Sequence, residues 1–444
     1  MLTKDRMFSG KDLFRLLWPL IAEQLLAVFV GMVDVLMVSK AGEAAVSGVS
    51  LVDSINILII QVLFGLTSGG TVVCARFIGR KDKKDASRAG AQMLLFTVLL
   101  SLAVTAVMLL GGRHLLRIIF GKTAADVMDN AVIYLMITVL SFPFLALYNS
   151  CVAVFRANKV TRLSLYVSLL MNAVNIAGNA FCIFVLKMGV AGVAIPTVLS
   201  RALAAGVMLF CLQSPKNELR IRSLKDFEPD FMIMKKICAI GIPSSIESGI
   251  FQFGKLTLQS LVSSLGTTSI AAFAVAFNLA SFLYLPGSAM SAGLLTVVGQ
   301  CCGAGEEKQA KDYAWLLVGI NYVLLAFLCT AMYLGCRNIV GWYHLSPEAA
   351  ELAEGLIRAH TWAMIIWPVA FLFPNYFRAT GKAAFTMVIA ISSMWIFRVG
   401  LAHVFIHVLH MNVLGVWYAM FIDWFFRVVV FAARYWLDNR KENR

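Results

Sequence analysis

Residues 19–42 read PLIAEQLLAVFVGMVDVLMVSKAG, and residues 243–266 read PSSIESGIFQFGKLTLQSLVSSLG. The two stretches align without a gap, with Pro, Glu, Phe, Val, Ser and Gly at equal positions, and further matches continue to Ala86 and Ala310. Proline and glycine act on the backbone itself, so the shared positions indicate a scaffold that occurs twice. Asp34 breaks the symmetry, because Leu258 stands at its place in the second copy.

The composition is that of a membrane protein. Of 444 residues, 60% are hydrophobic and only 14% are charged, and the mean hydropathy is +0.81. A soluble protein cannot bury so much apolar surface, so lipid must solvate most of the chain. The formal net charge of +14 lies in short loops between apolar runs. There it indicates orientation in the membrane and not a nucleic-acid partner.

The sequence predicts no metal site and no cofactor. The nine cysteines are scattered, mostly in apolar segments, and form no CxxC pair. His403, His407 and His410 share helical spacing, but no cysteine or acid accompanies them, which disfavours a metal there. The first apolar run is too long and too polar for a cleavable signal peptide.

Twelve apolar runs are long enough to cross a bilayer, which requires about 20 residues each. They lie near 13–38, 46–75, 88–110, 127–155, 161–186, 190–213, 231–264, 269–301, 311–334, 349–377, 383–409 and 414–435. We therefore expect an all-α polytopic protein with twelve transmembrane helices.

Basic residues concentrate in alternate loops and in both tails, which predicts that both termini lie in the cytosol. The expected location of the protein is the inner (plasma) membrane. A polar stretch at 214–230 reads as a cytosolic linker between six-helix bundles at 1–213 and 231–444. Because each bundle has an even number of helices, the two copies are expected to share one orientation, related by an axis along the membrane normal.

Ionisable groups inside spanning helices are expensive and are therefore candidates for function. Asp34 is such a group, with an interfacial ion pair as its alternative role. Asn172, Asn175 and Asn179 form a stripe on one face of the fifth run. Amide oxygens beside one carboxylate suit a small hard cation such as Na⁺, although asparagines also serve as hydrogen bonds between membrane helices.

A second group of polar residues is expected to line a substrate cavity: Glu23, Glu247, Gln252 and Lys255. The duplicated Glu23 and Glu247 could instead be hydrogen-bonded packing elements. Lys255 could neutralise a carboxylate or repel cationic substrates.

Further charged residues are interpreted as structural. Arg156 and Arg378, at equivalent positions of the two halves, are expected to extend from helix ends toward water. Arg398, Asp423 and Arg427 are expected to form an ion-pair network between the last two helices.

Several of these motifs, in this order, resemble the MATE (multidrug and toxic compound extrusion) transporters of bacteria. The resemblance is carried by Pro19, Gly31-Met32-Val33-Asp34, Gly42, Gly79, Gly303, residues 175–184, the run GVAGVAI at 189–195, Thr197 and Phe377-Arg378-Ala379-Thr380-Gly381. It covers essentially the whole chain.

The resemblance implies two six-helix bundles arranged as a V, with alternating access driven by inward H⁺ or Na⁺. It implies that Asp34 is the first-helix acid, with Asn175 and Thr197 beside it. Asn179 stands where many members have an acid. Phe251, and Trp367 or Pro368, stand where one branch has acids, so that branch's second cation site is not expected here.

We therefore predict a monomeric secondary antiporter, not an enzyme, that exports organic, cationic and amphipathic compounds in exchange for H⁺ or Na⁺. Asp34, Asn175, Asn179 and Thr197 are its predicted cation site. The sequence contains no nucleotide-binding motif, which argues against an ATP-driven pump. Two alternatives are a flippase for lipid-linked sugars or peptidoglycan precursors and a polytopic membrane enzyme.

Overall fold

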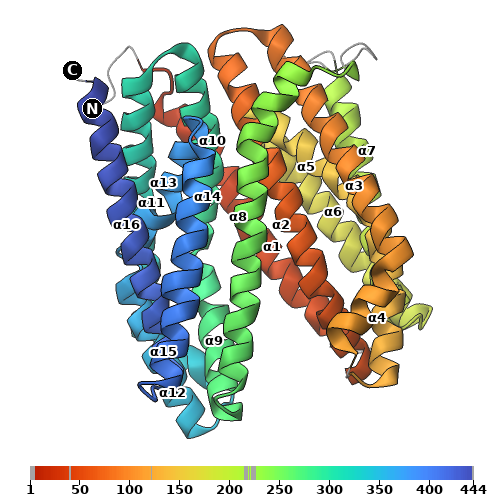
Figure 1. The fold of residues 1–444 in the computed structure, drawn as a ribbon. Coiled ribbons are helices and arrows are strands. Elements are labelled where there is room, and N and C mark those ends of the chain that lie inside the picture. Colours follow the sequence, from red (N-terminus) through yellow and green to blue (C-terminus); the bar gives the residue numbers. More distant parts are fainter. Residues whose placement is uncertain are drawn as a thin grey trace. The chain divides into compact units, whose positions relative to one another are not determined.

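The computed structural model describes residues 6–39, 42–121, 123–214, 219, 221 and 227–442. These residues form helices joined by short turns, with no strand among them (Figure 1). Most of the expected linker 214–230 lies outside the described residues.

The described residues of the first half form nine helical segments. They are α1 (Gly10–Ser39), α2 (Glu43–Gly79), α3 (Lys83–Phe120), α4 (Ala125–Thr138), η1 (Val139–Ser141), α5 (Phe142–Ala157), α6 (Thr161–Ala180), η2 (Phe181–Val185) and α7 (Ala191–Gln213). The consecutive segments α4, η1 and α5 together cover one expected span, and α6 with η2 covers another.

The described second half contains α8 (Phe231–Ser263), α9 (Thr267–Leu283), α10 (Leu285–Ala304), α11 (Glu307–Gly341), α12 (Pro347–Ala363), α13 (Trp367–Ala379), α14 (Ala383–Ser392), η4 (Ser393–Gly400), α15 (Leu401–His407) and α16 (Leu414–Glu442). Two segments, η2 and η4, are wound more widely than an α-helix. Such turns occur often at functional sites.

Most of the twelve expected spans correspond to helices that are long and apolar enough to cross a membrane. By length and composition, ten helices in the described residues can cross a membrane, and α12 with α13, bent by 53°, would make an eleventh. The twelfth expected span is α8, which is 33 residues long and is interrupted by polar residues such as Glu247 and Lys255. The prediction of an all-α polytopic membrane protein is confirmed.

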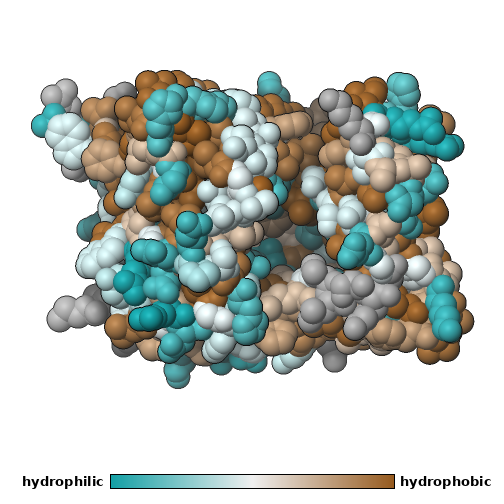
Figure 2. Space-filling model, turned by 90° about the horizontal axis from the view of Figure 1, so that it is seen from below, coloured by the Kyte–Doolittle hydropathy of each residue, from teal (hydrophilic) through white to brown (hydrophobic). Residues whose placement is uncertain are grey.

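Lipid exposure is visible in the side chains. Large apolar residues such as Phe29, Leu110 and Phe327 are 72%, 90% and 74% exposed, which only an apolar solvent tolerates on this scale. Figure 2, which looks at the end bearing α12 and α15, shows hydrophilic residues over the helix ends with hydrophobic ones between and around them.

The chain forms two compact units. The first contains Met1–Ser245 and Gly299–Glu306, and the second contains Ile246–Val298 and Glu307–Arg444. The predicted bundles 1–213 and 231–444 thus supply most of one unit each, while the first part of α8 and the end of α10 pack with the first unit. Ser245 Oγ on α8 donates to the Val62 carbonyl of α2 at 2.6 Å.

The repeated glycines have a structural reason. Gly42 and Gly266 precede α2 and α9 with φ of 100° and 90°, a conformation that disfavours any side chain. At Gly79, a Cβ would collide with the carbonyl oxygen of Gln300, and the repeat-related Gly303 makes the same close approach to the carbonyl of Arg76. The duplicated positions therefore fix turns and helix crossings.

Within the first unit, α2 packs against α3, α4 and α5, while α6 packs against both α1 and α7. Buried apolar side chains of α2, α4, η1–α5 and α7, including Val52, Leu135, Phe142 and Ala194, form one continuous core. Residues of α7 belong to this core, and α6 packs between α7 and α1. The arrangement positions the polar residues described next.

Candidate functional site

The four predicted cation-site residues form one chain of hydrogen bonds in the first unit. Asn179 Nδ2 donates to Asp34 Oδ1 at 3.0 Å and to Asn175 Oδ1 at 3.2 Å. Asn175 Nδ2 donates in turn to Thr197 Oγ1 at 3.2 Å. The hydrogen bonds join α1 to the consecutive helices α6 and α7, and Asp34 and Asn179 are 145 residues apart. The alternative role of Asp34, an interfacial ion pair, finds no support among the described residues, where Asp34 accepts its hydrogen bond from Asn179.

Local sequence explains how α6 and α7 supply their part. Asn175 and Asn179 are one helical turn apart and share a face. Gly178 lets Pro196 of α7 approach closely, because a Cβ there would lie 2.7 Å from Pro196 Cβ. The proline brings Thr197, the next residue, beside Asn175. Asn172, the third member of the predicted stripe, is bonded to Ser168 Oγ at 3.4 Å and is not part of the chain.

The site retains oxygen atoms for a ligand. Asn179 is fully buried, and its Oδ1 has no hydrogen-bond partner in the described part of the chain. Asp34 is half-buried, and within the described residues only one of its carboxylate oxygens accepts a hydrogen bond. A carboxylate and an amide oxygen left over in a membrane helix pair can bind a proton or a monovalent cation.

Three residues that the sequence reasoning missed extend this site. Tyr134 Oη donates to Asp53 Oδ1 at 3.3 Å, and Arg201 Nη1 donates to Ser141 Oγ at 2.6 Å. The Asp34 carboxylate interacts electrostatically with both Asp53 and Arg201. The signal was present in the sequence, because Asp53 and Arg201 are ionisable residues inside apolar runs.

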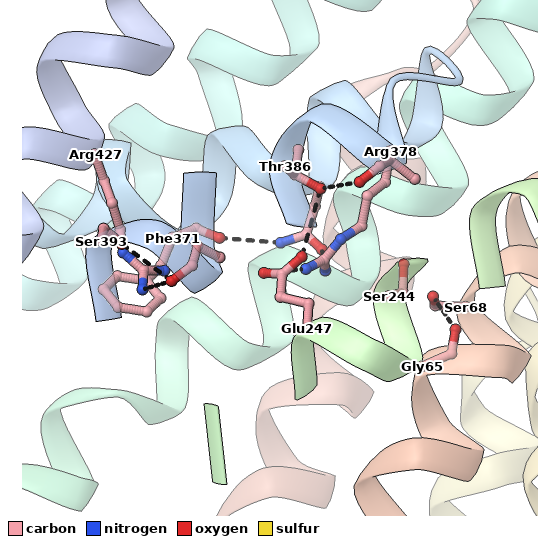
Figure 3. A network of polar contacts seen from close by, with 12 residues as sticks. Gly65, Ser68, Ser244, Glu247, Phe371, Arg378, Thr386, Ser393 and Arg427 are labelled. Carbon is pink, nitrogen blue, oxygen red and sulfur yellow. Dashed lines mark hydrogen bonds and ion pairs between the residues drawn. The ribbon is translucent and has the colours of Figure 1, made fainter. Parts of the chain in front are cut away.

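Each of the duplicated glutamates is ion-paired within its own unit. Glu23 is ion-paired with Arg156 at 2.8 Å in the first unit, and Glu247 with Arg378 at 2.7 Å in the second. Thr386 also donates to Glu247 at 3.5 Å (Figure 3). These glutamates are packing elements, which was one of the two predicted alternatives. The expectation that the arginines extend toward water is wrong, because their side chains are only 15% and 16% exposed.

The other two predicted cavity residues lie on α8 in the second unit. Gln252 is half-buried. Lys255 is also half-buried, and its Nζ lies 5.3 Å from the Phe251 ring centroid and 5.7 Å from that of Phe277. Neither residue belongs to the hydrogen-bonded chain around Asp34.

The predicted ion-pair network is present in the second unit. Asp423 Oδ2 lies 2.6 Å from Arg398 Nη2, and Asp423 Oδ1 lies 2.9 Å from Arg427 Nε. His403 Nδ1 lies 3.0 Å from the Val399 carbonyl of its own helix turn. Among the described residues, no three His, Cys, Asp or Glu side chains are arranged to hold a metal ion.

The sequence pattern of the MatE family matches this chain twice, over residues 19–181 and 243–404. The two matches begin at Pro19 and Pro243, the pair that opens the internal repeat.

Similar proteins match over nearly their full length. An uncharacterized transporter, YisQ of Bacillus subtilis, is 28% identical over 443 residues, covering 97% of this chain and 94% of the relative. A probable multidrug resistance protein, NorM of Thermotoga maritima, is 24% identical over 444 residues, covering 98% and 93%. A crystal structure of MATE in the bent conformation has the same fold, with a TM-score of 0.90, 20% identity and coverage of 98% and 96%. The chain therefore belongs to the MATE family of membrane transporters.

Proposed function

We propose that this protein is a secondary antiporter that exports organic compounds by alternating access, with Asp34 as the residue that binds the coupling cation. The observation that carries the proposal is the hydrogen bond from Asn179 to Asp34, which ties the ion-binding carboxylate of α1 to α6. Relatives named for multidrug resistance support export as the direction of transport. The alternative of a membrane enzyme is wrong for a member of this family, and the flippase alternative is not favoured.

Coupling follows from the state of the carboxylate. An ionised Asp34 accepts a charge-assisted hydrogen bond from Asn179, and neutralising it weakens that bond. A cation shifts the equilibrium between inward- and outward-open states only if it binds the two states unequally. A hydrogen bond between α1 and α6 that depends on the charge of Asp34 supplies such a difference. Loading from outside then favours substrate release, and loss of the cation to the cytosol resets the cycle.

The electrostatics favour H⁺ over Na⁺ as the coupling ion. Asn179 takes the place of an acid, so the hydrogen-bonded chain contains one carboxylate only. Arg201 adds a permanent positive charge within electrostatic range of Asp34. The Arg201 charge opposes the binding of either ion, but a small hard cation needs several oxygen ligands whereas a proton needs one carboxylate oxygen.

The setting of the proposed antiporter is the plasma membrane, with both termini in the cytosol and the chain acting as a monomer. The expectation of a cationic substrate depended on Glu23 and Glu247 as cavity charges. Arg156 and Arg378 neutralise them, so this expectation loses its support.

The test is efflux from proteoliposomes with an imposed pH or sodium gradient. We expect the pH gradient to drive transport in the unaltered protein and Asp34→Asn to reduce it to the level of empty liposomes. Asp129→Asn makes the same chemical change at an exposed position of α4 and should transport normally. Unchanged transport by Asp34→Asn would remove Asp34 from the mechanism, and transport driven by sodium alone would identify Na⁺ as the coupling ion.

A further inference from the structure

Three cationic side chains of the second unit surround one phenyl ring. Lys255 Nζ lies 5.3 Å from the centroid of the Phe251 ring, and the guanidinium carbons of Arg398 and Arg427 lie 5.2 and 5.6 Å from it. The cations come from α8, η4 and α16, so helix packing and not local spacing brings them together. We call these three residues and Phe251 the cationic cluster.

Among the described residues, Asp423 is the carboxylate that pairs with the arginines of this cluster. Asp423 accepts hydrogen bonds from Arg398 Nε at 2.8 Å and Arg427 Nε at 2.9 Å. Lys255 has no hydrogen-bond or ion-pair partner in the described part of the chain, and Arg398 repels it. Glu247, the acid two turns before Lys255 on α8, is already ion-paired. Three cations and one carboxylate leave two positive charges in excess.

The arginines and the lysine differ in what they do for the fold. Arg398 and Arg427 are nearly inaccessible and hold η4 against α16 through Asp423, and Arg427 also donates to the Ala390 carbonyl at 3.1 Å. Lys255 forms no hydrogen bond or ion pair between helices in the described residues, and it is half-buried within a spanning helix. An ammonium inside a membrane-spanning helix is costly to place, and such residues mark substrate pathways.

Aromatic rings accompany the excess charge. Phe277 lies 5.7 Å from Lys255 Nζ, and the Phe371 ring lies 5.2 Å from the Arg427 guanidinium (Figure 3) and stacks on Trp367 at 5.0 Å. Flat apolar rings beside unbalanced positive charge fit a molecule with an aromatic body and an anionic group.

We propose that the cationic cluster is a substrate subsite for amphipathic aromatic anions, such as carboxylates or sulfonates, and that Lys255 is its specificity-determining contact. The anionic group would pair with Lys255, while the aromatic body lies against Phe251 and Phe277. The proposal rests on the proposed export function and names its substrate class.

Equilibrium binding tests the proposal without any ion gradient. Two fluorophores that share the xanthene ring system are compared: carboxyfluorescein, an anion, and rhodamine 6G, a cation. Each is titrated by fluorescence anisotropy with the purified protein in lipid nanodiscs. We expect carboxyfluorescein to bind at least about tenfold more tightly, and Lys255→Gln to weaken its binding about tenfold.

The variants separate charge from packing. Lys255→Arg keeps the charge and should retain the affinity for the anion, whereas Lys255→Glu should make rhodamine 6G the preferred ligand. Lys235→Gln removes an exposed lysine from the same helix and should have no effect. Unchanged carboxyfluorescein binding in a folded Lys255→Gln protein, or a preference of the unaltered protein for rhodamine 6G, would overturn the proposal.

Failure of the export proposal would look different. Asp34→Asn should bind both fluorophores as the unaltered protein does, because Asp34 lies in the first unit. If Asp34→Asn still transports while Lys255→Gln loses anion binding, the coupling proposal fails and the anion subsite stands. If Asp34→Asn stops transport while Lys255→Gln binds normally, the reverse holds.

Discussion

The two units contain the same duplicated ion pair but differ in their remaining interior charges. Glu23 with Arg156 and Glu247 with Arg378 occupy equivalent positions of the repeat and are each neutral overall. Beyond these pairs, the candidate site of the first unit brings together two carboxylates, Asp34 and Asp53, and one guanidinium, Arg201. The cationic cluster of the second unit brings together Lys255, Arg398 and Arg427 with one carboxylate, Asp423.

The difference indicates a division of work. Duplicated charges pair within each unit, whereas the charges described here that occur once leave the candidate site around Asp34 negative and the cationic cluster positive. A negative site suits the proposed coupling cation, and a positive site suits the proposed anionic substrate. The following changes test this comparison.

The largest expected effect is at the fully buried Asp423. Asp423→Asn leaves Arg398 and Arg427 without a counter-charge, so we expect a loss of about 3–5 kcal/mol in the free energy of unfolding. Asp438→Asn, on the same helix, disturbs pairs with half-exposed Lys382 and Arg434 and should cost less than about 1 kcal/mol. Unfolding in detergent measures both. Equal losses would show that Asp423 does not balance the second unit's cations.

Breaking the duplicated ion pair should lower the free energy of unfolding by a similar amount in each unit. Arg156→Leu and Arg378→Leu each leave a glutamate unpaired in a mostly buried position, and we expect each to cost about 3 kcal/mol. Replacing both partners with leucine should restore most of the stability. A large loss in one unit only would contradict the view that the pair has one structural role.

Gly42→Ala and Gly266→Ala test whether the repeat places the same turn in each unit. Both glycines have positive φ and open space around the position of a Cβ, so the cost is conformational, about 1–2 kcal/mol each. Gly111→Ala, in a helix with open space, should instead be neutral or slightly stabilising. We expect the melting temperature to fall by a similar amount in Gly42→Ala and Gly266→Ala and not to fall in Gly111→Ala.

The smallest expected effect concerns Asp53. Asp53→Asn removes a negative charge near Asp34 and leaves Arg201 in place, so we expect the apparent affinity for the coupling cation to fall three- to tenfold, on the order of 1 kcal/mol. The measurement is the proton concentration that half-activates efflux. Glu43→Gln, at the exposed start of the same helix, is the control. An unchanged half-activating concentration would exclude Asp53 from the coupling site.

Much of the candidate site could be predicted. The position of Asp34 in the repeat and the spacing of Asn175 and Asn179 identified the residues, and the resemblance added Thr197. Asp53 and Arg201 could not be ranked, because their importance comes from lying near Asp34 and not from any motif of their own. The pairing of Glu23 with Arg156, 133 residues apart, also depends on the tertiary arrangement of the first unit.

The sequence alone determined the all-helical membrane architecture, the duplication and its glycine turns, and the acid that occurs once. Hydropathy, helical period and backbone chemistry are local properties, so they can be read along the chain. Only the tertiary structure decided which charges neutralise one another: it paired both repeated glutamates with arginine and left Lys255 beside Arg398 and Arg427. Charge balance depends on distances between helices, and the packing of each whole unit sets those distances.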